Sequence, residues 1–329
     1  MRMALELSTS SMQTNDRAGP GPHPSGKSAA LCLLAKAVEP YLDEYVDYYS
    51  AIGFSGIFIF DNSDNNTLQD WTPRSRSGSV DNNNTSKTMI SVYPWPGVNN
   101  QRSAYQKCAM NLINYTNFTW AAFYDSDEFL VLRKHDNVVD LLQEHCDSGS
   151  LSINWVLMGT SNETFYRPLP MTKRFTYRHQ EINPNVKTIV KLSDLDLSFN
   201  FQWSGGEQIH NFKLVNGTFQ KDTNGTIFTG PYNANGPEDI AAIYHFFTKS
   251  KSEFRVKGCT TGKPNGHKSH CKCFATMACV CSTKQSSRLP YCTCLRETLL
   301  ITHCNFMFPQ QAARHRWLEP LLMTAHGFK

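Results

Sequence analysis

The chain has 329 residues, of which 18% are charged and 40% are hydrophobic, and its formal net charge is +4. This length suits one large α/β domain or two small ones, and the composition is that of a globular protein. The charge is mild and no long block of lysine and arginine is present, so we expect no nucleic-acid partner. No run of about 18 apolar residues occurs, so we expect none of this sequence to span a membrane.

Residues 1–28 are rich in serine, glycine and proline and carry little apolar character. The apolar core that a secretory signal peptide needs is missing from them. They are therefore predicted to be a disordered segment that precedes the first domain. We expect contact with a membrane only if an N-terminal anchor is missing from this chain.

Three segments after residue 28 predict one strand–helix–strand unit. "ALCLLAK" (30–36) has the length of a buried strand, and "PYLDEYVDYYSAIGF" (40–54) repeats apolar residues at helical spacing. Pro40 begins this helix, and Gly53 stands where it would stop. "GIFIFDNSD" (56–64) is typical of a second buried strand. Short connections around one helix indicate a parallel βαβ unit.

The same alternation continues to about residue 150. After a polar loop, "TMISVYPW" predicts a strand, Gln101–Tyr115 a helix, "FTWAAFYDSDEFLVL" a single strand and "NVVDLLQEHC" a short helix. Alternating strands and helices predict a mostly parallel sheet that is covered on both faces. In such sheets ligands bind at the carboxyl ends of strands, where Asp61 and the acidic residues around Asp125 stand.

The second half of the chain changes to short strand-like runs between glycine, proline and asparagine turns. We expect these runs to add strands to the same sheet, some of them antiparallel. They are "SLSINWVLMG", "KRFTYRH", "VKTIVKL", "EQIHNFKLV" and "AAIYHFFTKS".

Asp125, Asp127 and Glu128 stand within four residues at the end of an apolar run. Clustered carboxylates repel one another and are costly to bury unless a cation or hydrogen-bond donors compensate. Either the strand ends in a solvated turn, or a positive group lies there. Two aspartates at this spacing offer oxygen ligands to a hard ion such as Mn²⁺ or Mg²⁺, which stabilises a departing diphosphate. Taken alone, this motif is common by chance.

The longer context of the motif resembles a known family. "LLAKAVEPYLDEYVDYYSAIGFSGIFIFDNSD" followed by "WAAFYDSDEFLVL" resembles the start of family-92-like and family-2-like glycosyltransferases of the GT-A fold. The resemblance continues, in order, through "INWVLMGTS", "KRF", "VKTIVKLSDL", "IHNFKLV" and "IYHFFTKSKSEFRVKG". It implies a Rossmann-like GT-A domain at residues 29–258, an α/β fold whose mostly parallel sheet is flanked by helices. A short Cys-rich appendage would follow at residues 259–329.

The resemblance also implies roles for individual residues. Asp125 and Asp127 would coordinate the metal that bridges the donor diphosphate. Glu128 would stand beside them as a third catalytic residue, and His245 would be a further metal ligand. The residues expected to contact the donor or acceptor are Lys36, Glu39 and Asp61 around the nucleoside, Arg102 and Lys249 near the phosphates, and Trp155 with the Gly159–Ser161 turn at the sugar or acceptor.

One turn departs from the family pattern, and one catalytic role is open. The sequence reads Ala37-Val38 where the family often has Asn-Glu, which weakens the case for nucleoside contacts from that turn. An inverting transfer needs a carboxylate to accept the proton of the acceptor hydroxyl. The candidates for this base are Glu163, Glu207 and Asp239.

Several of these residues also have a structural interpretation. Asp61 is equally suited to capping a turn, and a histidine in an apolar run, such as His245, is more often a core residue than a ligand. Lys249 stands where a helix starts. The tyrosines between residues 41 and 49 are most simply one helix face packed on the sheet.

Cysteines and glycosylation sequons bear on the cellular compartment. Eight Asn-x-Ser/Thr sequons occur, and seven of the eleven cysteines lie between Cys271 and Cys304. Three Cys-x-Cys pairs in that segment leave open structural disulfides, a zinc site, or no special role. An oxidising compartment fits these features, and we expect the lumen of the Golgi or the ER.

The sequence therefore predicts a metal-dependent glycosyltransferase of the hexosyltransferase class. It would move a sugar, with galactose as the family-level choice, from a UDP-linked nucleotide donor to a hydroxyl of a glycan acceptor with inversion. Two alternatives stay open: a metal-dependent phosphohydrolase that uses the same carboxylates, and an inactive relative that binds a glycan or a partner.

Overall fold

The computed structural model describes residues 26–36, 38–71, 73, 88–98, 100–197 and 210–260, without the side chains of residues 39 and 258–260. Most of the predicted N-terminal disordered segment and nearly all of the Cys-rich segment lie outside these described residues. The domain boundaries inferred from the sequence therefore stay predictions.

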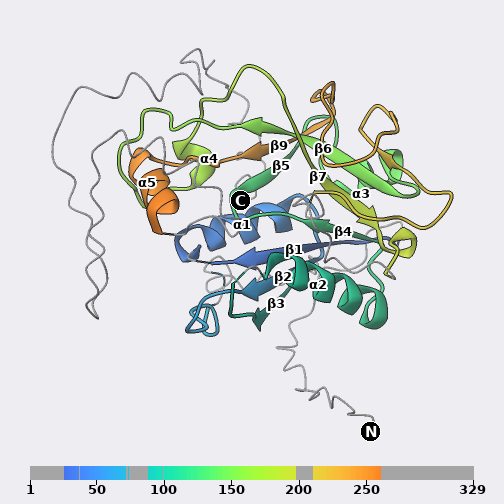
Figure 1. Cartoon of the computed structure of the whole chain (residues 1–329), viewed down its shortest axis with the longest axis horizontal. Helices are drawn as coiled ribbons and strands as arrows, with labels where there is room; N and C mark the ends of the chain where they lie inside the picture. The colour runs from blue at the N-terminus through green and yellow to red at the C-terminus, as the bar shows by residue number, and fades with distance from the viewer. Residues whose placement is uncertain are drawn as a thin grey trace, which may run out of the picture.

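Parallel strands form the first half of a nine-stranded sheet, in the order β3-β2-β1-β4 (Figure 1). The helices that connect them are α1 (Glu39–Ala51) and α2 (Gln101–Tyr115). This is the parallel βαβ arrangement expected from the sequence. The strands are β1 (Ala29–Ala35), β2 (Gly56–Asp61), β3 (Met89–Pro94) and β4 (Trp120–Phe123).

The two helices cover opposite faces of the parallel strands. Along β1, Leu31 and Leu33 pack into the core that includes the tyrosines of α1, whereas Ala30 and Cys32 pack into the core that includes α2. Successive side chains of a strand point to opposite faces, so a continuous apolar run such as β1 is the pattern of a strand buried on both sides. The prediction of a sheet covered on both faces is confirmed.

The second half of the sheet is mixed. β7 pairs antiparallel with β4, β6 pairs antiparallel with β7, β9 runs parallel to β6, and β5 pairs antiparallel with β9 at the far edge. The predicted α/β fold with a mostly parallel sheet, completed by some antiparallel strands, is confirmed. The remaining elements are β5 (Glu128–Leu132), α3 (Val138–His145), β6 (Ser150–Leu157), α4 (Met171–Arg174), β7 (Asn183–Lys191), the 3₁₀ turn Leu192–Asp194, β8 (Gln220–Lys221), β9 (Ala241–His245) and α5 (Lys251–Thr260).

The single strand predicted at residues 118–132 is two strands, so that prediction was wrong. β4 ends at Phe123 and β5 begins at Glu128, with a turn between them in which the Glu128 amide donates to the Asp125 carbonyl over 3.1 Å. β4 lies beside β1 and β7, whereas β5 lies beside β9. Aspartate and serine favour such a turn over an extended ladder. The acidic residues therefore lie at the carboxyl end of one strand and the start of another.

Two further strand predictions were also wrong. "KRFTYRH" is not a strand, because Pro170 and the Glu44 carboxylate, which accepts from the amides of Met171 and Thr172, begin the short helix α4 instead. That stretch contributes only bridge residues at Tyr177 and Arg178, the latter opposite Met158. In "EQIHNFKLV", residues 210–215 form only an isolated bridge, and residues 207–209 lie outside the described part of the chain.

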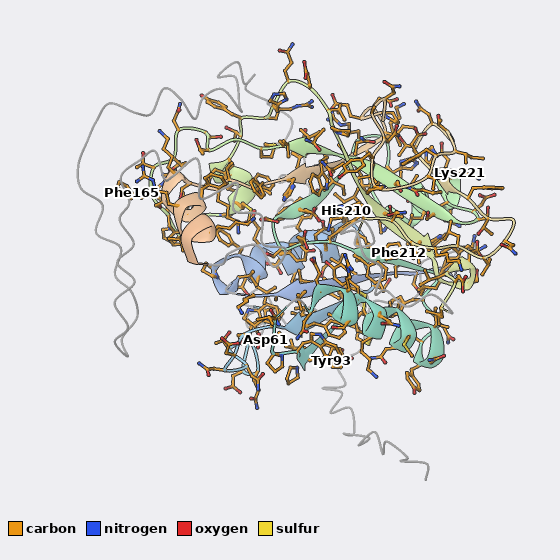
Figure 2. All side chains as sticks on the ribbon, in the orientation of Figure 1. Asp61, Tyr93, Phe165, His210, Phe212 and Lys221 are labelled. Carbon is orange, nitrogen blue, oxygen red and sulfur yellow. A yellow bond between two sulfur atoms is a disulfide. The ribbon has the colours of Figure 1, made fainter. Side chains whose placement is uncertain are left out.

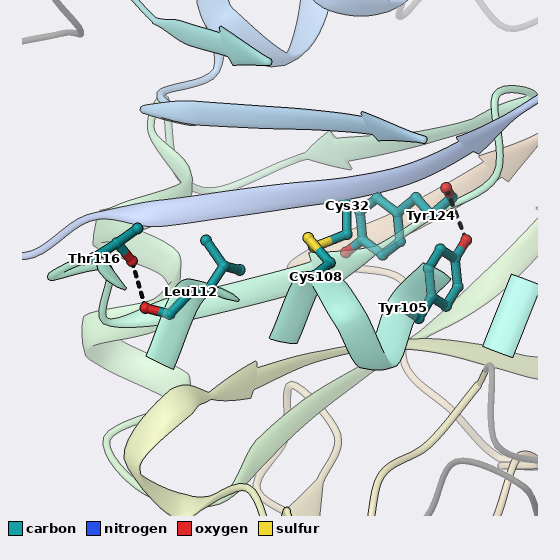
Figure 3. Close-up of a disulfide and its surroundings, with 6 residues drawn as sticks. All are labelled: Cys32, Tyr105, Cys108, Leu112, Thr116 and Tyr124. Atoms are coloured by element: carbon teal, nitrogen blue, oxygen red, sulfur yellow. Dashed lines mark hydrogen bonds between the residues drawn. A yellow bond between two sulfur atoms is a disulfide. The ribbon is translucent and has the colours of Figure 1, made fainter. Parts of the chain in front are cut away.

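A disulfide joins the first strand to the second helix (Figure 3). It links Cys32 of β1 to Cys108 of α2 across 76 positions of sequence. The sequence reasoning considered disulfides only for the C-terminal cysteines and missed this one. Cys146, by contrast, is a buried free thiol, whose pKa burial raises to about 12. Among the described residues, no helix is both long and apolar enough to cross a bilayer.

Candidate active site

Sheet topology brings the predicted site residues to one edge. The carboxyl ends of the parallel strands meet there, because Ala35 of β1 is opposite Asp61 of β2, and Cys32 is opposite Phe123 of β4. The antiparallel ladder of β5 and β9 then pairs Glu128 with His245. Residues more than a hundred positions apart thus lie next to the turn at residues 124–127.

Asp125 is supported by α2 on one side and by β7 on the other. Its Oδ1 accepts a hydrogen bond from Gln101 Nε2 over 2.5 Å, and its Oδ2 lies 3.1 Å from Lys187 Nζ. The Tyr105 hydroxyl donates to the Tyr124 carbonyl over 3.2 Å, which fixes the backbone just before Asp125 (Figure 3). Burial raises the pKa of Asp125, but the charge of Lys187, its hydrogen bond and the charge of His245 together outweigh burial and leave that pKa below its usual value. Asp125 is therefore a carboxylate anion whose orientation is fixed by these contacts.

Glu128 and Lys187 are both fully buried at the centre of the site. Glu128 Oε2 accepts from the Asp125 amide over 2.8 Å and lies 3.2 Å from Lys187 Nζ, while its Oε1 has no hydrogen-bond partner. Burial raises the pKa of Glu128 well above its usual value, and the opposing charge of Lys187 does not cancel this. Burial lowers the pKa of Lys187, but Asp125 and Glu128 outweigh it and raise that pKa to about 12. Lys187 is therefore a permanent internal cation, and its principal ion pair is with Asp125.

Asp127 lies between a lysine and a histidine. Its Oδ2 is 2.9 Å from Lys257 Nζ on α5, and its Oδ1 is 3.5 Å from His245 Nε2 at the end of β9. Burial raises the pKa of Asp127, but Lys257 and His245 outweigh it and leave the pKa well below its usual value. The side chain of Lys257 is 41% exposed, whereas Asp127 and His245 are buried. Asp127 is thus an anion, and its partner on the solvent side is the long, partly exposed side chain of Lys257.

Aromatic rings close one side of the site. The Trp155 ring centroid lies 4.3 Å from that of His245 and 5.2 Å from that of His210, and the Trp155 indole Nε1 has no hydrogen-bond partner. His210 lies near the middle of the molecule (Figure 2), and its Nδ1 donates a hydrogen bond to the Val186 carbonyl over 2.9 Å. Burial, and then the charge of Lys187, lowers the pKa of His210 to about 4. His210 is therefore neutral at physiological pH, and Trp155 offers an unused N–H donor.

Lys249 holds an unusual backbone conformation beside the site. Its φ angle is +50°, in the left-handed region that residues with side chains seldom adopt. Its Nζ lies 4.6 Å from the ring centroid of Tyr41. Burial lowers the pKa of Lys249, against the opposing charge of Asp127. This amine therefore adds positive charge on the side of the site where α5 begins.

Comparisons with known proteins give relatives that share one family name. No protein-family model matches the chain. A curated glycosyltransferase family 92 protein from Ricinus communis is 23% identical over 237 residues, which cover 69% of this chain. Proteins of the same family name from Oryza sativa subsp. japonica and Arabidopsis thaliana are 24% and 28% identical over 118 and 105 residues. The chain resembles the family 92 glycosyltransferases.

The chain matches only part of these family 92 proteins. The matched region is 36% of the length of the Ricinus communis protein and 16% of the Arabidopsis thaliana protein. Among solved structures, S. aureus TarS is 14% identical with a TM-score of 0.39, and the match covers 67% of this chain and 61% of that one. The resemblance to family 92 that the sequence indicated is thus confirmed at the level of sequence relatives.

Some residues expected around the nucleoside have structural roles. Asp61 is buried, and its two carboxylate oxygens accept from the amides of Ser63 and Leu68 over 2.9 Å each. It caps the loop after β2, as the structural interpretation held, and lies apart from His210 (Figure 2). Lys36 is exposed at the same edge of the sheet. As nucleoside contacts, both stay predictions.

The remaining predicted residues are two at the starts of helices and three candidate bases. Arg102 lies on the first turn of α2, near the acidic turn, and Glu39 begins α1, but its side chain is not described. Of the candidate bases, Glu163 is paired with Arg167, and Asp239 lies beyond the other end of the β5–β9 ladder. Asp239 is therefore remote from the site, and its candidacy as the base was wrong. Glu207 lies outside the described residues.

Sequence reasoning missed the cations that neutralise the carboxylates. Lys187 was quoted within "VKTIVKL" only as part of a strand, yet a lysine in a strand with buried neighbours needs an anionic partner, and that was an available signal. Lys257 and Gln101 lie on helices whose patterns gave no such signal. Their roles follow from sheet topology, which brings α2, β7 and α5 to the same turn.

The donor atoms at this turn fit a hard divalent ion. Asp125 and Asp127 offer carboxylate oxygens and His245 an imidazole nitrogen, residue types that suit Mn²⁺ or Mg²⁺, but the ligand atoms of these three described residues are not all within 4.8 Å of one another. Asp127 and His245 already face one another with buried side chains, and Lys257 is the more exposed of the two lysines beside the aspartates. An ion would therefore take the place of the Lys257 ammonium and leave Lys187 in position.

Proposed function

We propose that this chain is a glycosyltransferase that moves a sugar from a UDP-linked donor to a hydroxyl of a glycan, in a reaction that needs Mn²⁺ or Mg²⁺. The observation that carries the proposal is the convergence of Asp125, Asp127 and His245 where the carboxyl ends of the parallel strands meet. The resemblance to family 92 supports the same chemistry. Galactose as the sugar and inversion at its anomeric carbon are the finer parts of the proposal.

The metal would be held by Asp125, Asp127 and His245. When bound, the ion supplies positive charge to the diphosphate that departs from the sugar. The chain adds cations of its own, because Lys249, just before α5, and Lys257, in the last turn of α5, both act on Asp127. Charges that are fixed before the reaction stabilise a developing anion without reorganisation. Both lysines are therefore assigned to the phosphates.

The aromatic side of the site would receive the sugar. Trp155 is partly exposed, and its flat ring is suited to stacking against a sugar ring. Neutral His210 packs against Trp155, and the charge of the buried Lys187 acts on His210. These neighbours hold the Trp155 ring in position.

The expected cellular compartment is consistent with the proposed reaction. A disulfide in the core and eight sequons in the sequence support the lumen of the Golgi or the ER.

The proposal is tested by calorimetric titration of UDP into the purified chain with and without Mn²⁺. Binding is expected only with the metal, and it should be lost in the double variant Asp125→Asn/Asp127→Asn. Asp64→Asn, at an exposed turn, is the matched control and should bind as the wild type does. UDP binding that is independent of Mn²⁺ and of both aspartates, in folded protein, would contradict the proposal.

A second assay separates transfer from hydrolysis. UDP-sugars are incubated with the protein and Mn²⁺, with and without a panel of glycans, and released UDP is measured. We expect release to rise with one glycan and a new glycosidic product to form. Equal release with and without every glycan would favour the phosphohydrolase.

A further inference from the structure

A second cluster of metal-ligating side chains lies at the other end of β5. It consists of His135, in the loop after β5, and Glu144 and His145, in the last turn of α3. The ligand atoms of all three lie within 4.8 Å of one another. β5 runs from Glu128 at the acidic turn to Leu132, so this cluster is separated from the proposed active site by the length of a strand.

A hydrogen bond and a close contact hold the three side chains of the cluster together. His135 Nε2 is 2.8 Å from one oxygen of Glu144, and His145 Nε2 is 3.4 Å from the other. The two imidazole side chains are only 10% and 14% exposed, whereas Glu144 is 64% exposed. Their ring planes are nearly perpendicular, at 89°, with centroids 5.6 Å apart. The histidines therefore form a buried corner that Glu144 closes on the solvent side.

His145 faces Glu144 with an unused nitrogen. Its Nε2 is buried and has no hydrogen-bond partner, although a carboxylate oxygen lies nearby. The backbone of Thr223 lies beside the same ring. A neutral His145 whose proton is on Nδ1 would direct a lone pair from Nε2 toward the carboxylate. Two electron-rich atoms at this separation call for a cation between them.

The surroundings favour a metal over a proton as that cation. Both imidazole side chains are largely buried beside the Glu144 carboxylate. The nearby Lys134 is engaged elsewhere, because its Nζ is 2.8 Å from Asp239.

We propose that His135, His145 and Glu144 bind a Zn²⁺-class transition-metal ion, with the fourth position open to solvent beside Glu144. Two imidazoles and one carboxylate are a ligand set that Zn²⁺ commonly takes, and imidazole favours Zn²⁺ over Mn²⁺ or Mg²⁺. The ion would fasten the loop after β5 to the end of α3 and, through His145, to the buried Thr223. Its role is structural, and the site is separate from the Mn²⁺ or Mg²⁺ site of the proposed reaction.

The test is a Zn²⁺ titration of the purified full chain against a chromophoric chelator, repeated for Glu144→Gln and His145→Gln. Each variant should lose one Zn²⁺ equivalent or weaken it by at least about 10-fold, as loss of a ligand or its support does. His179→Gln, a histidine outside the cluster, is the matched control and should keep every equivalent. Glu144 is largely exposed, so Glu144→Gln folds even if the buried histidine variant does not.

Cobalt separates this site from the cysteines of the C-terminal segment. Co²⁺ bound through sulfur gives a strong thiolate charge-transfer band, whereas Co²⁺ bound by two histidines and a carboxylate gives only weak visible bands. We expect Glu144→Gln to lose the weak bands and keep any thiolate band. Zn²⁺ affinity, stoichiometry and cobalt spectra that are identical in wild type, Glu144→Gln and His145→Gln would overturn the proposal, as would the absence of Zn²⁺ binding. Neither result would affect Mn²⁺-dependent UDP binding.

Discussion

At the start of β5 the charged groups are buried, and beyond its end they lie near the surface. Glu128 and Lys187 are inaccessible to solvent, and Asp125 is oriented by α2 and β7. At the other end, Glu144 is largely exposed and Lys134 pairs with Asp239 in solvent. Buried charges must be matched by counter-charges built into the fold, whereas surface charges are screened by water. The two ends of β5 thus differ: a buried anionic site lies at its start, and the cluster of His135, Glu144 and His145 lies near the surface beyond its end.

Removal of Lys187 is expected to have the largest effect on stability. Lys187→Met would leave the buried Glu128 and the partly exposed Asp125 beside one another without their cation, at a cost of about 3–5 kcal/mol in the free energy of unfolding. Urea denaturation measures the change. Lys191→Met, at the end of the same strand, is the control, since Lys191 only donates to an exposed carbonyl of Asp147, and it should change stability by less than about 0.5 kcal/mol. Equal losses in both variants would remove the distinction between buried and exposed charge.

The disulfide should come next. It anchors α2, which carries Gln101 and thereby the support of Asp125. A cross-link across 76 positions restricts the unfolded chain, so Cys32→Ala/Cys108→Ala should cost about 4 kcal/mol by chain entropy. Cys146→Ala, which alters a buried free thiol, should cost only about 1 kcal/mol in the same thermal or urea melts. A double variant no less stable than Cys146→Ala would contradict this.

The dependence of stability on pH should report His210. Its pKa falls from the ordinary 6.5 to about 4 in the folded protein, chiefly by burial. The unfolded chain therefore binds more protons between these values, and stability falls as pH drops through that window, by up to about 3 kcal/mol. His210→Gln should flatten this part of the profile in urea melts at pH 7 and pH 5. His179→Gln should leave the pH dependence of the unfolding free energy unchanged. The same pH dependence in His210→Gln as in the wild type would contradict the prediction.

The smallest effect is expected for the surface pair of Lys134 and Asp239. Both side chains are more than half exposed, so solvent and salt screen their attraction. Asp239→Ala should leave the unfolding midpoint unchanged within error at low and high salt. A large, salt-dependent loss would show that charge at this end of β5 is as important as at the start.

Local patterns predicted the first half of the fold well. The continuous apolar strands β1 and β2 and the helix at Gln101–Tyr115 have unambiguous periods and short connections. The second half was harder, because short runs such as "KRFTYRH" have no clear period. There, the contact of the Glu44 carboxylate with the start of α4 decides the local structure, and it joins residues far apart in sequence.

The same limit applied to the site. The carboxylates were named from their own pattern, because their residue types carry the chemistry of metal binding, whereas His245 was named only through the resemblance to family 92. Lys187, Lys257 and Gln101 were not, since only the antiparallel order of β4, β7 and β6 and the position of α5 bring them to the acidic turn. Asp239 failed as a candidate base for the converse reason, because it is an acidic residue at the wrong end of a ladder.

Electron paramagnetic resonance of Mn²⁺ mixed with UDP and protein tests most directly whether the acidic turn before β5 is the active site. Wild type, Asp127→Asn and Glu144→Gln are compared at equal concentrations. We predict that the signal of free Mn²⁺ falls when wild type or Glu144→Gln is added with UDP, and that it stays unchanged with Asp127→Asn. Capture of Mn²⁺ by folded Asp127→Asn as strongly as by wild type would contradict an active site at the start of β5.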